Sequence, residues 1–178
     1  MHGRAFVLGD DVNTDHIISG RRRSRSATVE EMARYVFEDI RPDLVSRLQP
    51  GDFVVAGENF GCGSSREQAP QALKAAGVGG IIARSFARLF YRNAVNIGLP
   101  VIILPGASRI LEGDELRVDW QAGRLVDVTA GFDLTFSPLP SLMARILEAG
   151  GLIPFLLGGG NLGPAVDLER ASPGGMRE

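Results

Sequence analysis

Cysteine is almost absent from this chain, and Cys62 is the single one. No disulfide can therefore form within the chain, and one thiolate cannot by itself bind zinc or an iron–sulfur cluster. A chain without a disulfide framework is typical of the cytosol, so we expect a cytoplasmic protein. Histidine is also scarce, since the chain has only His2 and His16, and we expect His16 to be structural rather than catalytic.

Long hydrophobic runs and a strong net charge are missing as well. The N-terminus has no apolar signal region, and the most apolar stretch, residues 134–157, is interrupted by Arg145, Glu148 and several glycines and prolines. The formal net charge of -2 argues against a nucleic-acid partner. The sequence therefore predicts neither secretion nor a membrane span, and it favours a small molecule or another protein as the partner.

The length and composition fit one domain with its own hydrophobic core. The chain has 178 residues, of which 44% are hydrophobic, and no internal repeat suggests a second domain. We expect that domain to span residues 1–157. From residue 158 to residue 178 the composition turns to glycine, proline and charge, which predicts a flexible tail.

Hydrophobic periodicity predicts strands and helices in alternation. Buried strands are expected at residues 4–8, 53–56, 79–83 and 101–104, and helices at residues 28–38, 43–48, 69–76, 86–96 and 138–148. Helical spacing predicts that Leu89 and Phe90 are buried. Residues 115–120 and 125–128 alternate around a glycine turn, which predicts an antiparallel hairpin with an edge strand at 132–136. Together these elements predict a layered α/β domain with a mixed sheet and flanking helices.

The most informative stretch is the turn at residues 57–68, which we call the serine turn. It joins a predicted strand to a predicted helix, so its glycines lie where backbone amides can converge on an anion. Ser64 and Ser65 each stand three residues before a glutamate or glutamine, which is the spacing of a capping box. One serine is therefore expected to cap the helix while the other faces a ligand. Arg66 adds a planar fork suited to a carboxylate or a phosphate.

Other glycine-rich sites fit the serine turn poorly. A nucleotide P-loop ends in Gly-Lys-Ser/Thr, and the turn contains no lysine. A dinucleotide fingerprint needs a third glycine at the position of Arg66. A nucleophile elbow needs a Gly-x-Ser-x-Gly frame, which neither serine has. A plain capped helix would explain one serine but not the second serine and the arginine, so we interpret the turn as an anion site.

A second basic feature is the segment at residues 20–26, which carries Arg21, Arg22, Arg23 and Arg25 and no apolar anchor. This composition predicts an exposed, mobile loop. Such a charge run can simply be solvated, or it can act as an anion gate if the fold places it beside the serine turn.

Several motifs of the chain resemble one family. Residues 13–18 read NTDHII, residues 59–67 read NFGCGSSRE, and SFAR at residues 85–88 is followed by FYRNA at residues 90–94. This series resembles the swivelling domain of the aconitase superfamily and, among its free-standing members, the small subunits of 3-isopropylmalate dehydratase. The likeness extends over residues 9–104, and it implies a layered β/β/α swivelling domain.

The resemblance implies a hydro-lyase of leucine biosynthesis that interconverts 2-isopropylmalate and 3-isopropylmalate and is active only with a large subunit. In that family the large subunit binds a [4Fe-4S] cluster, a division that the single cysteine here matches. Carried onto this sequence, Ser64 would take the proton from carbon, Ser65 would hydrogen-bond the substrate and Arg66 would clamp a carboxylate. Asp15 would be a further active-site residue. Arg21 would supply an arginine from the neighbouring basic loop.

Two departures from the family leave the substrate open. Gln68 stands where the family often has histidine, and arginines follow Arg21 where the family often has residues suited to an apolar substituent. Arg23 or Arg25 could instead bind the third carboxylate of a tricarboxylate, as in a homoaconitase, and a methylmalate-type dehydratase is another option. A non-catalytic module that binds small acids is the alternative from a different class. A homo-oligomer of the isolated chain is compatible with all of these interpretations.

Overall fold

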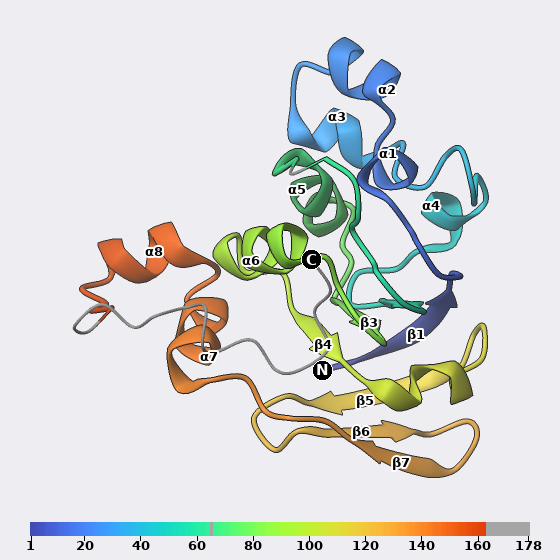
Figure 1. The fold of residues 1–178 in the computed structure, drawn as a ribbon, viewed down its shortest axis with the longest axis vertical. Coiled ribbons are helices and arrows are strands. Elements are labelled where there is room, and N and C mark those ends of the chain that lie inside the picture. The colour runs from blue at the N-terminus through green and yellow to red at the C-terminus, as the bar shows by residue number, and fades with distance from the viewer. Residues whose placement is uncertain (65, 163–178) are drawn as a thin grey trace.

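The computed structural model describes residues 1–64 and 66–162. Its centre is a seven-stranded sheet with the strand order β4-β3-β2-β1-β5-β6-β7 (Figure 1). The strands are β1 (His2–Val7), β2 (Phe53–Ala56), β3 (Gly80–Ala83), β4 (Val101–Ile103), β5 (Glu115–Asp119), β6 (Arg124–Asp127) and β7 (Phe132–Thr135). β1 to β4 pair in parallel, whereas β1 and β5, β5 and β6, and β6 and β7 pair antiparallel. The sheet is therefore mixed, as the sequence predicts.

The helices are α1 (Thr14–Ile17), α2 (Gly20–Arg25), α3 (Val29–Ala33), α4 (Leu44–Arg47), α5 (Gln68–Ala75), α6 (Arg88–Asn96), α7 (Ser141–Glu148), α8 (Leu152–Leu157) and the 3-10 helix η1 (Pro105–Arg109). Some of them cover the parallel part of the sheet. Figure 1 shows α5 and α6 over the parallel strands and β5 to β7 on the far side. Within the described ranges, no helix has the length and apolar character needed to cross a bilayer.

The parallel strands are buried on both faces because their side chains alternate between two hydrophobic cores. On β2, Val54 and Ala56 belong to the core that includes the buried faces of α5 and α6. Phe53 and Val55 belong to the other core, where they pack with Leu116 of β5. The hairpin strands, the parallel strands and the helices thus form three layers, which confirms the predicted β/β/α arrangement.

The helix predicted at residues 28–38 is shorter than expected. α3 ends at Ala33, and turns continue the chain to residue 40. Phe37 has a left-handed backbone with a φ of 60°, and its ring is fully buried. Its amide also donates to the carbonyl oxygen of Ile17 at 3.0 Å. Burial of the ring and this long-range hydrogen bond override the local helical pattern.

Leu89 of α6 lies on the exposed face of the helix and not on the buried face that the sequence predicts. The sequence pattern places Leu89 in the core, but Leu89 is 53% exposed. The buried face of α6 consists of Phe90, Tyr91, Ala94 and Val95. Because successive helical residues are rotated by about 100°, a residue directly before this stripe points away from it.

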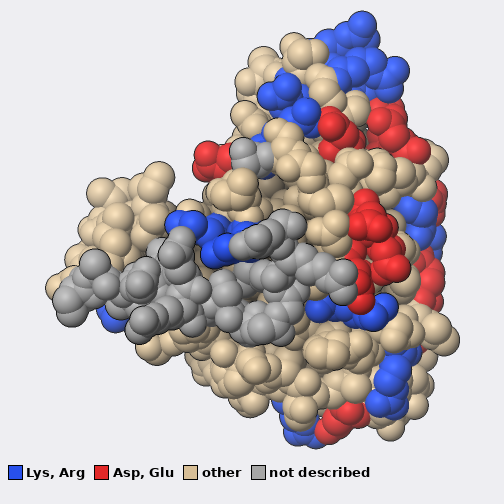
Figure 2. All heavy atoms as spheres, viewed as in Figure 1, with Lys and Arg blue, Asp and Glu red and all other residues tan. Residues whose placement is uncertain are grey.

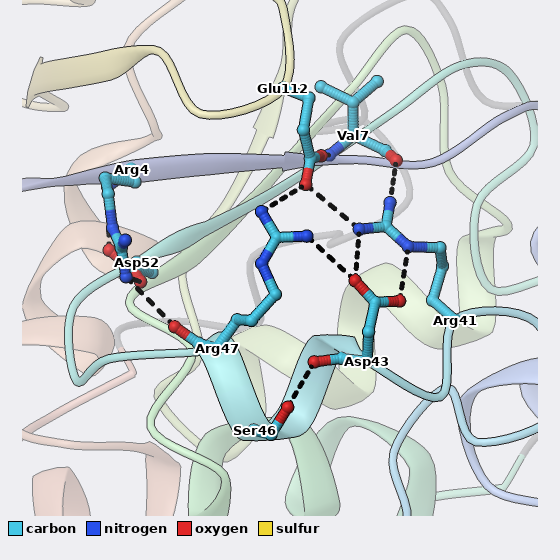
Figure 3. A network of polar contacts seen from close by, with 8 residues as sticks. All are labelled: Arg4, Val7, Arg41, Asp43, Ser46, Arg47, Asp52 and Glu112. Carbon is cyan, nitrogen blue, oxygen red and sulfur yellow. Dashed lines mark hydrogen bonds and ion pairs between the residues drawn. The ribbon is translucent and has the colours of Figure 1, made fainter.

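A network of ion pairs fixes the end of β1 (Figure 3). Arg41 donates to the carbonyl oxygen of Val7 at 3.1 Å, and Glu112 accepts from the amide of Val7 at 2.7 Å. Arg41 also pairs with Glu112 at 3.0 Å and with Asp43 at 3.1 Å. Hydrogen bonds from Arg41 and Arg47 lower the pKa of Asp43 to about 2. Because Val7 is the last residue of β1, this network holds the strand end from which the next loop departs.

Two buried carboxyl groups lie in the hairpin layer. Asp114 is 6% exposed and Asp127 is fully buried. Oδ1 of Asp127 accepts from the amide of Ala130 at 2.8 Å, whereas its Oδ2 is buried without a hydrogen-bond partner among the described residues. Burial raises the pKa of Asp127, and the neighbouring Asp114 raises it further.

The raised pKa of Asp127 predicts that the contribution of this group to stability falls as the pH rises. An unfolded aspartate has a pKa of about 3.9, so between that value and the higher folded value the folded state binds more protons. The stabilising contribution is complete below the unfolded pKa and is lost as the pH rises through the folded pKa. We expect Asp127→Asn to remove this decline, because its amide donates without titrating. Urea unfolding between about pH 4 and about pH 8 measures the free energy, and each pKa unit is worth about 1.4 kcal/mol.

The matched control for this experiment is Asp133→Asn, which changes an exposed carboxylate on β7. That variant should keep the decline seen in the unmodified protein. If Asp127→Asn also kept it, the raised pKa of Asp127 would not be the cause of the decline.

Candidate active site

Three loops meet at the carboxyl ends of β1, β2 and β3. They comprise residues 8–19, 57–67 and 84–87. Backbone hydrogen bonds between the loops run from Gly61 to Val12 (2.7 Å), from Thr14 to Cys62 (2.9 Å), from Phe60 to Ser85 (3.0 Å) and from Ala87 to Phe60 (2.9 Å). The serine turn is the middle loop, so it is held from both sides. Open α/β sheets bind ligands at this edge.

Gly61 lets the serine turn pack against α6. Its φ is +79°, and a Cβ at this position would lie 2.2 Å from Cγ of Phe90. Both the backbone conformation and the close contact therefore exclude a side chain at residue 61. Phe60 packs edge-on against Phe86 and Phe90, with ring centroids 5.9 Å and 5.2 Å away. This aromatic cluster packs the serine turn against α6.

The described part of the serine turn shows no capping box from Ser64. α5 begins at Gln68 with Glu67 as its N-cap and has no side-chain cap hydrogen bond among the described residues, so Ser64 does not cap this helix, whereas a cap from Ser65 stays a prediction. The amide of Arg66 instead donates to the carbonyl oxygen of Ser64 at 2.7 Å, which closes a tight turn before the helix. Ser64 itself is exposed. Ser65 lies outside the described residues, so its contact with substrate stays a prediction.

Asp15 and Arg66 form an ion pair between the first and the second loop. Nη1 of Arg66 contacts Oδ1 of Asp15, and the side chains are 20% and 55% exposed, respectively. The structure thus brings Asp15, Ser64 and Arg66 together at one edge of the sheet. Asp15 occupies the guanidinium fork that the sequence assigns to a substrate carboxylate. A bound carboxylate would therefore have to share or replace this contact.

α1 positions the aspartate. Oδ1 of Asn13 accepts from the amide of His16 at 2.8 Å, and the amide of Asn13 donates to Nδ1 of His16 at 3.3 Å. This reciprocal pair is a capping box built from Asn and His, and it fixes the first turn that carries Asp15. His16 therefore makes a structural contact in this fold.

The arginine-rich segment at residues 20–26 is a helix and not the predicted loop. Ser19 caps α2 by accepting from the amide of Arg22 at 3.4 Å. Arg22 anchors the helix, because its guanidinium lies 3.9 Å from the ring centroid of Tyr35 and its Nε donates to Glu38 at 2.6 Å. These contacts replace the apolar anchor that the segment lacks. Figure 2 shows basic side chains over α2, at the top of the view, with acidic side chains directly beneath them.

The other arginines of α2 differ in their surroundings. Arg21 points to the acidic side, with a guanidinium nitrogen 3.8 Å from Asp39 and 4.0 Å from Glu38. Nε of Arg23 is buried and has no hydrogen-bond partner in the part of the chain that the structure describes. Arg25 is exposed.

The start of α2 lies beside the ion pair of the candidate site. A Cβ added at Gly20 would lie 4.0 Å from Oδ1 of Asp15. The basic segment is therefore adjacent to the site, although nothing in the structure assigns its arginines to a substrate.

Glu38→Gln is expected to loosen α2. The hydrogen bond from Arg22 lowers the pKa of Glu38, and the amide keeps the size of the side chain while removing its charge. Trypsin should then cut after Arg21, Arg22, Arg23 or Arg25 several times faster, because local opening of the helix exposes the backbone. Glu30→Gln, an exposed carboxylate on α3, is the matched control. Equal cleavage rates in the two variants would contradict an anchoring role for Glu38.

The described residues do not fit the ligand set of an iron–sulfur cluster. Among them, no group of three or more His, Cys, Asp or Glu side chains is placed to hold a metal ion. Cys62 is half-buried, and burial raises the pKa of its thiol, which disfavours the thiolate needed for ligation.

Thr14, Tyr35 and Glu38 make contacts that the sequence reasoning missed. Oγ1 of Thr14 donates to the carbonyl oxygen of Ser64 at 3.1 Å. Its position next to Asp15 in the NTDHII motif was the signal that could have identified it. Tyr35 and Glu38 contact α2 only because of the fold, and no local pattern marks them.

Comparisons with known proteins show what this chain is similar to. A family model described as the aconitase C-terminal domain matches residues 22–105. The chain is 51% identical over 156 residues to 3-isopropylmalate dehydratase small subunit 2 of Archaeoglobus fulgidus, covering 88% of this chain and 94% of that relative. It is 50% identical over 153 residues to the methanogen homoaconitase small subunit of Methanothermobacter thermautotrophicus, covering 86% of this chain and 88% of that relative.

A solved structure matches the fold as well. The crystal structure of 3-isopropylmalate dehydratase from Methanocaldococcus jannaschii has a TM-score of 0.84 and 41% sequence identity, and the match covers 89% of this chain and 93% of that chain.

Proposed function

Because this chain belongs to the family of 3-isopropylmalate dehydratase small subunits, we propose that it is the small subunit of a two-chain hydro-lyase. The enzyme would interconvert 2-isopropylmalate and 3-isopropylmalate by dehydration and rehydration, in leucine biosynthesis and in the cytoplasm. The observation that supports this role best is the meeting of Asp15, Ser64 and Arg66 where the three loops join.

In this proposal Ser64 accepts the proton that leaves carbon during dehydration and returns it during rehydration. A serine hydroxyl is a weak base by itself, so its alkoxide needs nearby positive charge and hydrogen-bond donors. Arg66 supplies charge two residues further along the chain, and its amide already binds the carbonyl oxygen of Ser64. The exposure of Ser64 leaves it open to a substrate that approaches from outside this chain.

Arg66 would clamp a substrate carboxylate while Asp15 orients the guanidinium. A guanidinium has five N–H donors in a fixed plane, so it can hold two carboxylates at once. The ion pair with Asp15 uses part of this capacity and fixes the plane before substrate arrives. Ser65, outside the described residues, would add a hydrogen bond to the substrate.

The partner in this proposal is a large subunit that carries a [4Fe-4S] cluster. A cluster of this kind is usually bound by several thiolates, and this chain offers Cys62 alone. Ser64 and Asp15 are both exposed, so the site is open on the side where a second chain could complete it. Neither chain alone would then hold a whole site, and each should be inactive by itself.

Co-expression with the cognate large subunit tests this proposal. The expected result is a stable complex of the two chains after affinity purification through a tag on this one. Ser64→Ala should assemble equally well, because the change is confined to an exposed hydroxyl. If the large subunit did not co-purify, a non-catalytic module that binds small acids would be the better explanation.

A second candidate function is the small subunit of a homoaconitase, because a relative of that name is 50% identical to this chain and the start of α2 lies beside Asp15. A tricarboxylate has one carboxylate more than isopropylmalate. Arg22 anchors the helix and Arg21 lies beside Asp39, which leaves Arg23 and Arg25 as the candidates for that additional group. Hydration rates of isopropylmaleate, citraconate and cis-homoaconitate, measured side by side, separate the candidates. A preference for cis-homoaconitate would move the protein to lysine biosynthesis, and a preference for citraconate would indicate a methylmalate-type enzyme.

A further inference from the structure

One buried hydroxyl ties the serine turn to the loop that carries Asp15. Thr14 is only 2% exposed, and its Oγ1 donates to the carbonyl oxygen of Ser64 at 3.1 Å. Its amide donates to the carbonyl oxygen of Cys62 at 2.9 Å. These two carbonyls flank Gly63, where the chain turns with a φ of +89°. Thr14 therefore holds both sides of the bend at Gly63.

The hydrogen bond from Thr14 closes a ring of contacts. The carbonyl oxygen of Ser64 accepts a second hydrogen bond from the amide of Arg66 at 2.7 Å. The guanidinium of Arg66 pairs with Asp15, and Asp15 follows Thr14 directly in the chain. The ring fixes the three candidate site residues relative to one another. The hydrogen bond from the Thr14 hydroxyl is the contact of this ring that a substitution can remove while nearly keeping the shape of the side chain.

We propose that Thr14 is a positioning residue that holds Ser64 in the position needed for proton transfer, through the hydrogen bond from its hydroxyl to the carbonyl oxygen of Ser64. This inference rests on the proposed function, in which Ser64 exchanges a proton with the substrate. Misplacement of a reacting group by about 1 Å can lower a rate about 100-fold. The effect should fall on kcat rather than on KM. When the hydroxyl is lost, Arg66 keeps the hydrogen bond from its amide to Ser64 and its ion pair with Asp15.

Two variants separate the hydroxyl from the shape of the side chain. Thr14→Val removes the donor and keeps the branched shape, whereas Thr14→Ser keeps the donor and removes a methyl group. In the complex with the large subunit, we expect Thr14→Val to lower kcat by roughly 10- to 100-fold with little change in KM. Thr14→Ser should retain most of the activity. A merely structural role would affect the two variants alike.

Hydrogen exchange supplies a readout that does not depend on activity. In the same complex, backbone amides in residues 61–68 should exchange faster in Thr14→Val than in the unmodified protein, and Thr14→Ser should not differ from it. A kcat in Thr14→Val equal to that of the unmodified enzyme would overturn the proposal, and so would equal damage in both variants. If the unmodified complex showed no hydro-lyase activity, the proposed function would fail, and unchanged exchange in Thr14→Val would overturn the role of Thr14 separately.

Discussion

Alanine in place of Ser64 is expected to lower the kcat of the two-chain enzyme by about 10²- to 10⁴-fold, the usual contribution of a positioned acid or base. KM should change little, because the carboxylate fork of Arg66 and its partner Asp15 remain in place. Ser64 is exposed, so the substitution leaves no cavity and should not affect folding or assembly. Steady-state rates of isopropylmaleate hydration by the complex measure the effect.

Ser46→Ala is the matched control for that loss. Ser46 is an exposed serine on α4 whose hydroxyl donates to the carbonyl oxygen of Asp43 at 2.8 Å, and it belongs to none of the three site loops. Its replacement should leave kcat unchanged. Near-normal turnover in Ser64→Ala would remove Ser64 from the mechanism, and failure of that variant to assemble would assign it a structural role.

Gly61→Ala is expected to destabilise the fold by about 2 to 5 kcal/mol, the sum of a left-handed backbone penalty and overpacking. The added methyl group would meet the ring of Phe90 at 2.2 Å, and this ring is fixed by its contacts with Phe60 and Phe86. The serine turn would have to move away from α6 to accept it. Urea unfolding of the purified chain measures the loss of free energy.

Gly131→Ala isolates the backbone part of this effect. Gly131 has a similar φ of +73°, but nothing lies within 4 Å of an added Cβ. We expect a loss of about 1 to 2 kcal/mol there, from the backbone alone. Equal losses at the two glycines would mean that the contact with Phe90 does not hold the serine turn in place.

The serine turn and the layered fold could be predicted because their signals are local. Residues 53–56 are uninterrupted apolar residues, the glycines of the turn follow directly, and a helix pattern comes next. The pattern that predicts each element is therefore set by residues close to it in the sequence. The alternation of apolar and polar residues likewise predicted the β5–β6 hairpin, because one face of it packs on a core and the other is exposed to solvent.

Two departures from the sequence predictions come from contacts between distant segments. α2 is helical because Arg22 stacks on Tyr35 and bonds to Glu38, which a charge run cannot reveal. Phe37 leaves the helical conformation because its ring and amide find partners elsewhere in the core. The same holds for the site, where the pairing of Asp15 with a residue far along the chain became visible only in the fold.

The most direct test of the proposed function is the rate of isopropylmaleate hydration by the complex assembled anaerobically with its large subunit, compared with each chain alone. The proposal predicts turnover only when both chains are present, and faster turnover of isopropylmaleate than of citraconate or cis-homoaconitate. Full activity of the large subunit without this chain, or an assembled complex that hydrates none of the three acids, would contradict it.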